Sequence, residues 1–227
     1  MIFLKRSPLR IVRRGIFLYN YFMKIFQKLF ANPWSILINL LVLVMLDLLT
    51  PLEKTLGANI RLIYFHGVWV WAGIIFFGLA AVSGLAALLI KKEFWHTYSR
   101  AAGYTALLFW ITYLPMSLIV MKINWGGFFF DEPRWRVPMS FAVISILLQV
   151  GLFLVSRKAF TSGANLAFGL VLYWSLFSTQ SVLHPDSPIQ QSSGRIQIFF
   201  SIMLFLTLLL ALQISCWIKK KLPDTQT

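Results

Sequence analysis

The chain contains, from His66 to Ile90, the uncharged stretch HGVWVWAGIIFFGLAAVSGLAALLI. A helix needs roughly 20 mostly apolar residues to cross the hydrocarbon core of a bilayer, so this stretch is long enough to span it. It is continuous and rich in Leu and Ile rather than alternating with period two, which argues against a strand. The stretch therefore predicts a transmembrane helix.

Five other windows of the chain have the same length and character. The six predicted spans are Trp34–Leu52, His66–Ile90, Ala101–Met121, Val137–Ser156, Ala164–Val182 and Ile196–Ile218. The expected fold class is an all-α membrane protein, a six-transmembrane-helix bundle with an N-terminal amphipathic interfacial helix.

Composition excludes a water-soluble globule. Of the 227 residues, 59% are hydrophobic and 12% are charged, whereas a soluble domain carries about a quarter charged residues. The net charge of +14 in so apolar a chain indicates anionic lipid headgroups rather than nucleic acid as the partner. The single cysteine, Cys216, excludes a disulfide within the chain, a CxxC redox pair and a CxxCH haem-attachment site.

The basic residues predict how the chain is oriented. Six spans put both termini on one side. The terminal segments and the loops on that side carry fifteen of the 21 Lys and Arg residues, and the other three loops carry six. The positive-inside rule then places both termini in the cytoplasm and the loops 51–65, 122–136 and 183–195 on the outer face of the cell inner (plasma) membrane.

The chain divides into three parts around the spans. Residues 1–33 place basic residues opposite apolar ones at helical spacing, which predicts an amphipathic helix on the inner leaflet. A cleaved signal peptide is less consistent, because Asn20 and Lys24 interrupt the apolar stretch. Residues 34–218 form the membrane domain, and residues 219–227 form a cytoplasmic tail.

Three histidines are candidate ligands, and the predicted topology separates them. His66 opens the second span and His184 follows the fifth, so both are expected at the outer interface. Neutral imidazole binds haem iron well, which makes them a plausible axial pair, although each alone is more often an interfacial polar residue. His96 is expected to be exposed in an inner loop. Zinc is a weaker alternative, since a structural zinc site needs four ligands.

An aromatic stretch lies between these two histidines in sequence. It reads NWGGFFFDEPRWR over residues 124–136. Its rings are typical either of an aromatic belt at the membrane surface or of a surface that covers a porphyrin. Guanidinium groups suit haem propionates, and Arg61, Arg134, Arg136 and Arg195 all lie on the same predicted face. The ring-covering candidates are Trp125, Phe128, Phe129 and Phe130, and the propionate-binding candidates are Arg134 with Arg195 or Arg61.

These segments resemble a known family. The sequence RLIYFH ending at His66, Trp125-Gly126 with Arg134 nine residues after the tryptophan, and LHPDSPI over residues 183–189 are similar to the outer-face histidines and tryptophan-rich loop of the cytochrome c assembly proteins. Among these, the resemblance is closest to the haem-handling protein C of the cytochrome c maturation system. It covers nearly the whole chain after residue 33. The loop departs from the family pattern, because phenylalanines replace inner tryptophans and lose their N–H donors.

The resemblance implies a haem carrier rather than an enzyme. It implies that haem b is ligated by His66 and His184 and delivered for cytochrome c biogenesis. The implied partners are other membrane subunits of that system and a haem chaperone or apo-cytochrome. Nothing in the sequence resembles a nucleophile with its base. Two alternatives stay open: a haem b electron-transfer subunit of a respiratory or photosynthetic complex, and a non-haem scaffold subunit.

Polar and aromatic residues inside the spans give further expectations. Asp47 is expected to reach the interface or to pair with Arg61. Gln149 and Gln213 are expected to form hydrogen bonds between helices. Trp110 and Trp174 are expected to pack inside the bundle.

Overall fold

The computed structural model describes residues 29–52, 57–180, 189 and 192–222. Within these residues the secondary structure consists of helices and contains no strand. The helices are α2 (Pro33–Leu48), α3 (Ile60–Ile90), α4 (Glu93–Trp125), α5 (Pro133–Val155), α6 (Lys158–Ser178) and α7 (Gly194–Lys221). Residues 1–28, which make up most of the predicted amphipathic segment, lie outside the described residues.

Five of these helices, α3 to α7, are long and apolar enough to cross a membrane. The chain is therefore a multi-pass, all-helical membrane protein. The predicted first span corresponds to α2, which has 16 residues. At 1.5 Å per residue α2 is about 24 Å long, against about 30 Å of hydrocarbon.

Two predicted spans extend too far. The first was expected to reach Leu52, but α2 ends at Leu48. Pro51 follows closely, and the residue before a proline is disfavoured in a helix. The fifth was expected to reach Val182, but α6 ends at Ser178, where the Thr179 hydroxyl donates to the Ser175 carbonyl oxygen at 2.6 Å. Such local side-chain hydrogen bonds compete with the helical backbone.

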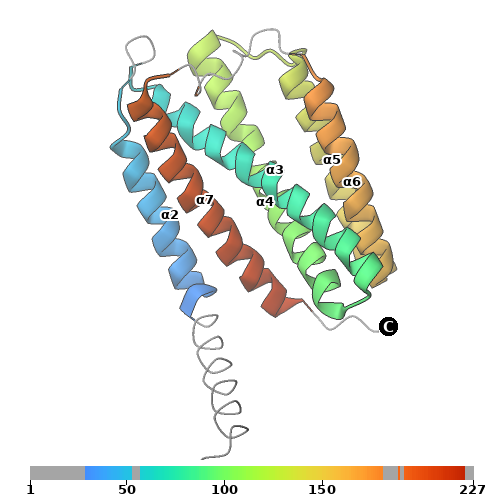
Figure 1. Ribbon diagram of the computed structural model, residues 1–227. Coiled ribbons are helices and arrows are strands. Elements are labelled where there is room, and N and C mark those ends of the chain that lie inside the picture. Colours follow the sequence, from blue (N-terminus) through green and yellow to red (C-terminus); the bar gives the residue numbers. More distant parts are fainter. Residues whose placement is uncertain (1–28, 53–56, 181–188, 190–191, 223–227) are drawn as a thin grey trace, which may run out of the picture.

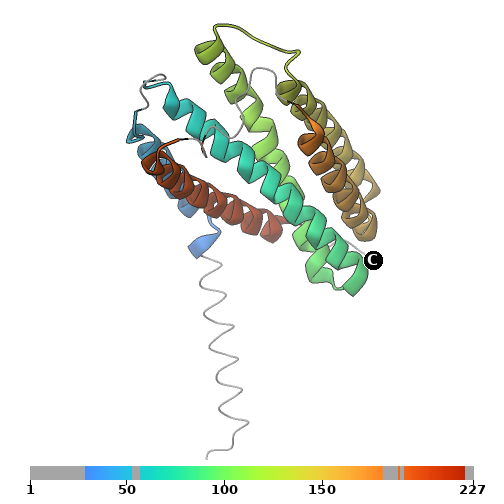
Figure 2. The same ribbon diagram turned by 45° about the horizontal axis from the view of Figure 1, so that its top comes forward.

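The helices form a bundle around a central pair. Helices α3 and α4 pack along each other, with α2 and α7 on one side and α5 and α6 on the other (Figures 1 and 2). Helix α6 packs on both central helices, and so does α7. Small residues allow the close approach of α3 and α6, as at Gly169, where an added Cβ would lie 2.6 Å from Ala81 Cβ.

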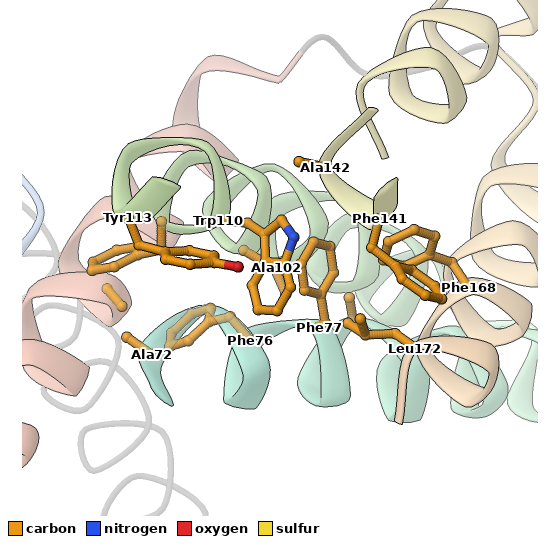
Figure 3. Packing of buried hydrophobic residues seen from close by; sticks show 14 of the residues in the cluster. Ala72, Phe76, Phe77, Ala102, Trp110, Tyr113, Phe141, Ala142, Phe168 and Leu172 are labelled. Carbon is orange, nitrogen blue, oxygen red and sulfur yellow. The ribbon is translucent and has the colours of Figure 1, made fainter. Parts of the chain in front are cut away.

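Aromatic side chains fill the core between α3 and its neighbours. Trp110 is fully buried and donates from its indole nitrogen to the Pro138 carbonyl oxygen at 3.1 Å. Phe77 contacts both Trp110 and Phe168, and Tyr113 continues the row on α4 (Figure 3). The packing role of Trp110 is confirmed.

The same prediction for Trp174 is wrong. Its side chain is 77% exposed. The buried residues Asn165, Phe168 and Leu172 mark the inner face of α6. Trp174 is two positions beyond Leu172, about 200° around the helix, so it points away from the bundle.

Polar side chains connect the helices inside the bundle. Gln149 donates to Asn165 at 3.2 Å, and Asn39 donates to Gln213 at 3.0 Å. Both glutamines therefore form the expected hydrogen bonds between helices. Asp47 and Arg61 do not form an ion pair within 4.0 Å, which was one of the two alternatives expected for Asp47.

Candidate functional site

The candidate site residues that the structure describes lie at one end of the bundle. The starts of α3, α5 and α7 meet there with the ends of α4 and α6, at the top of Figure 1. We call this the aromatic end. The opposite end, formed by the starts of α4 and α6 and the end of α7, is called the basic end. His66, the aromatic stretch and the candidate arginines belong to the aromatic end.

His66 is half-buried on α3, less than two turns after Ile60. Its ring centroid lies 5.7 Å from that of Tyr113 on α4, and its Nδ1 atom is shielded from solvent. Phe65 stacks on Trp69, and Trp69 contacts Phe109 at 4.5 Å between centroids. The imidazole is therefore held between two helices in aromatic surroundings.

Tyr113 is a neighbour of His66 that the sequence interpretation did not single out. Its hydroxyl is buried, and in the described part of the chain it has no hydrogen-bond partner. Figure 3 shows the hydroxyl directed toward Trp110, into the core. The available signal was its hydroxyl group inside a predicted span. Its ring supports the His66 imidazole.

Two of the candidate arginines lie at the same end of the bundle as His66. Arg61 and Arg195 are on the first turns of α3 and α7, next to Ile60 and Ile196. These two helix starts pack together through a buried cluster, which consists of Ile60, Tyr64, Val68, Ile196, Phe200 and Met203. Arg61 is half-buried, and Arg195 is exposed. We call His66, Arg61 and Arg195 the histidine group.

The aromatic stretch is a short loop between two helices. Asn124 and Trp125 end α4, and residues 133–136 begin α5, so the loop is residues 126–132 rather than the expected 122–136. Gly126 ends α4 with φ of +76°, a left-handed conformation that favours glycine. The loop therefore leaves α4 in a fixed direction.

The rings of this loop contact one another and remain exposed. Phe128 stacks on Phe130 with centroids 6.0 Å apart, and Phe129 meets Trp125 edge-on at 6.0 Å. Phe130 also contacts Trp135 at 6.2 Å. Their exposed fractions are 53% for Phe128, 38% for Phe129 and 56% for Phe130. The loop presents an apolar surface outward, with Arg134 and Arg136 exposed beside it on α5.

The histidine group and the aromatic loop occupy different parts of the aromatic end. His66 contacts Tyr113, which precedes Trp125 by twelve residues on α4. Twelve helical residues correspond to about 18 Å. Helix α5, which carries Arg134, packs on α4 and α6, whereas the histidine group belongs to α3 and α7. The structure thus places His66, Arg61 and Arg195 near the starts of α3 and α7, and places the aromatic rings beside Arg134 between α4 and α5.

Of the other two histidines, the structure describes only His96. His184 belongs to the connection between α6 and α7 and lies outside the described residues. His96 was expected to be exposed, and this was wrong. It is half-buried at the basic end, and its Nδ1 lies 2.7 Å from the Ser162 hydroxyl oxygen. Packing of α4 against α6 brings the two side chains together.

No family model, curated protein or solved structure matches the chain. Within the described residues, no group of three or more His, Cys, Asp and Glu side chains could hold a metal ion. The aromatic end is compatible with a ligand whose metal needs only one or two donors from the protein. The other contacts of such a ligand are made by its apolar and anionic parts. Haem is such a ligand.

Proposed function

We propose that the chain is a haem-binding membrane protein that holds haem b at its aromatic end and delivers it for cytochrome c biogenesis. In this proposal the chain has six spans, with α2 as the first, and an amphipathic segment at residues 1–33. The aromatic end faces outward from the cell inner membrane, and both termini are cytoplasmic. The chain acts as a carrier rather than as an enzyme.

The observation that carries the proposal is the composition of the histidine group. A half-buried imidazole on α3 lies among aromatic side chains, and two guanidinium groups lie on the adjoining first turns of α3 and α7. Imidazole suits haem iron, apolar surroundings suit the porphyrin ring, and guanidinium suits the propionates. The residues present therefore fit the chemistry of haem.

Each residue has a specific role in this proposal. His66 and His184 would hold the iron, and Tyr113 would fix the orientation of the His66 ring. Arg61 and Arg195 would bind the propionates. When bound, haem would supply an iron centre. Its absorption spectrum would report whether both histidines are ligands.

The aromatic loop has a separate role, because it lies about three turns of α4 beyond Tyr113. Its exposed rings, Phe128 to Phe130, would receive the porphyrin edge or the partner together with the half-buried Trp125. Arg134 would hold a propionate during transfer. The proposed partners are a haem chaperone or apo-cytochrome and other membrane subunits of cytochrome c maturation. An exposed loop suits transfer, since the partner must reach the ligand.

A visible absorption spectrum of the purified full chain tests the proposal. We expect haem b with a six-coordinate low-spin spectrum. His66→Ala and His184→Ala should each lower the haem content or change the spin state, because each removes one axial ligand. His96→Ala is the matched control, since it removes an imidazole at the basic end and should leave the spectrum unchanged.

Two results would contradict this assignment. Unchanged spectra in both His66→Ala and His184→Ala would exclude them as ligands. Failure of the wild-type chain to bind added haem would favour the non-haem scaffold alternative.

A further inference from the structure

The basic end contains a pocket that the proposed haem function does not use. Its volume is about 210 Å³. It lies between the starts of α4 and α6 and the end of α7. The residues that matter for its chemistry are His96, Arg100, Arg157, Lys158, Lys219 and Glu93. Because one water occupies about 30 Å³ in the liquid, the pocket has room for a small polar group.

The lining is strongly positive. It contains four Arg and Lys side chains and one carboxylate. Glu93 pairs with Lys158 at 2.8 Å. In the part of the chain that the structure describes, no carboxylate forms an ion pair with Arg100, Arg157 or Lys219. The charges that remain repel one another, so an anion in the pocket would lower the electrostatic energy.

Aromatic rings hold two of these cations in place. Lys219 Nζ lies 4.0 Å from the ring centroid of Tyr98, and the Arg100 guanidinium lies 5.8 Å from that of Tyr104. Both cations are only half-exposed. Cation–π contacts restrict the side chains, so less conformational freedom is lost when an anion binds.

The helix backbone adds partial positive charge to the pocket, and both the backbone and His96 add hydrogen-bond donors. Helices α4 and α6 begin at the pocket, and neither N-cap side chain, Lys92 or Arg157, makes a capping hydrogen bond. The N-terminus of a helix carries a partial positive charge and free N–H groups. When the Ser162 hydroxyl donates to Nδ1 of His96, the ring hydrogen is on Nε2, which can then donate to an anion.

We propose that this pocket binds a phosphate group. Phosphate offers several acceptor oxygens to a guanidinium, an ammonium and helix N–H groups at the same time, which a single chloride cannot do. The pocket lies where the apolar part of α7 gives way to Lys219–Lys221, beside Tyr98 and Tyr104. Aromatic and basic residues in such positions mark the level of lipid headgroups. The phosphate can belong to an anionic phospholipid or be free in solution.

The test uses the purified full chain in neutral detergent. Native mass spectrometry compares phosphatidylglycerol with phosphatidylcholine at equal concentration, and calorimetry measures binding of inorganic phosphate at constant ionic strength. Preferred binding of phosphatidylglycerol, by roughly tenfold, would support the site with a lipid as its source. Binding of inorganic phosphate, without a preference between the lipids, would support the site with a soluble source.

Variants separate the pocket from general surface charge. Arg100→Gln and Lys219→Gln should each weaken binding roughly tenfold, the effect of losing one charge-assisted hydrogen bond. Lys221→Gln is the matched control, because this exposed lysine lies at the same end of the bundle outside the pocket lining. The proposal is overturned if Lys221→Gln weakens binding as much as the pocket variants do. It is also overturned if neither phosphatidylglycerol nor inorganic phosphate binds preferentially.

Discussion

Asn165 connects three helices through its side-chain amide. Its oxygen accepts from Gln149 on α5, and its nitrogen donates to both the carbonyl and the hydroxyl oxygen of Ser99 on α4. Ser99 in turn donates to the Ala80 carbonyl oxygen on α3 at 2.8 Å. All of these groups are buried, so a group that loses its partner cannot form a hydrogen bond with water instead.

We predict that Asn165→Ala lowers the free energy of unfolding by about 1–3 kcal/mol, the cost of leaving buried polar partners unpaired. Thermal or denaturant unfolding in a neutral detergent measures the change. Ser140→Ala is the control, because the Ser140 hydroxyl is exposed and donates only to Arg136 of its own helix. Equal stability of the two variants would show that the buried hydrogen bonds contribute little.

The sequence predicts the burial and partners of some side chains correctly and of others incorrectly, for a physical reason. A glutamine inside an apolar span must find a polar partner, and Gln149 and Gln213 both do so. Burial of a tryptophan depends instead on which helix face meets a neighbour, which hydropathy does not reveal. Both Trp110 and Trp174 were expected near mid-span, but only Trp110 faces the core. His96 was misjudged because its partner, Ser162, comes from a helix 66 residues away.

At the scale of elements, the contact between α3 and α6 depends on small residues. An added Cβ at Gly169 would lie 2.6 Å from Ala81 Cβ, closer than real Cβ atoms approach one another. We expect Gly169→Ala to lower the unfolding free energy by about 1–3 kcal/mol, because the two helices must separate. Unfolding in neutral detergent measures this loss.

Gly151 on α5 provides the matched control. Nothing lies within 4 Å of a Cβ added there. Gly151→Ala should therefore be neutral or stabilise the protein by up to about 1 kcal/mol, as alanine favours the helix. If both glycine variants lose stability equally, close packing at Gly169 is not the cause.

The existence of the helices follows from the sequence more reliably than their ends do. Apolar windows identify the part of each helix that is compatible with lipid, and all five helices from α3 to α7 were found in this way. Helix ends depend on caps and on polar residues outside those windows. Thus α4 continues to Trp125, beyond the predicted Met121, until the left-handed Gly126 ends it.

At the scale of the whole molecule, the two ends of the bundle differ in chemistry. One end exposes phenylalanines between α4 and α5, and the other gathers Arg and Lys side chains around a pocket. We predict that a reporter active only outside the cytoplasm works when fused after Phe129 or Asp186 and fails after Lys92 or Lys220. The opposite pattern would place the proposed haem site on the cytoplasmic side.

The candidate site could be predicted from sequence as a set of residues but not as an arrangement. The types and order of His66, the aromatic stretch and the arginines follow from the chain. Their grouping does not, because it depends on how helices pack. The contact of α3 with α7 places Arg61 and Arg195 on adjoining first turns, while α5 carries Arg134 to another part of the same end.

Transfer of haem from the loaded protein to an apo-cytochrome or haem chaperone tests the central claim most directly. A carrier must release its ligand, so we predict that haem moves to the acceptor on mixing. His66→Ala should prevent loading, whereas Trp125→Ala with Phe129→Ala should slow loading or transfer without reducing membrane insertion. Haem that does not exchange, and is instead reduced by quinol and reoxidised by a partner cytochrome at turnover rates, would contradict the account and indicate an electron-transfer subunit.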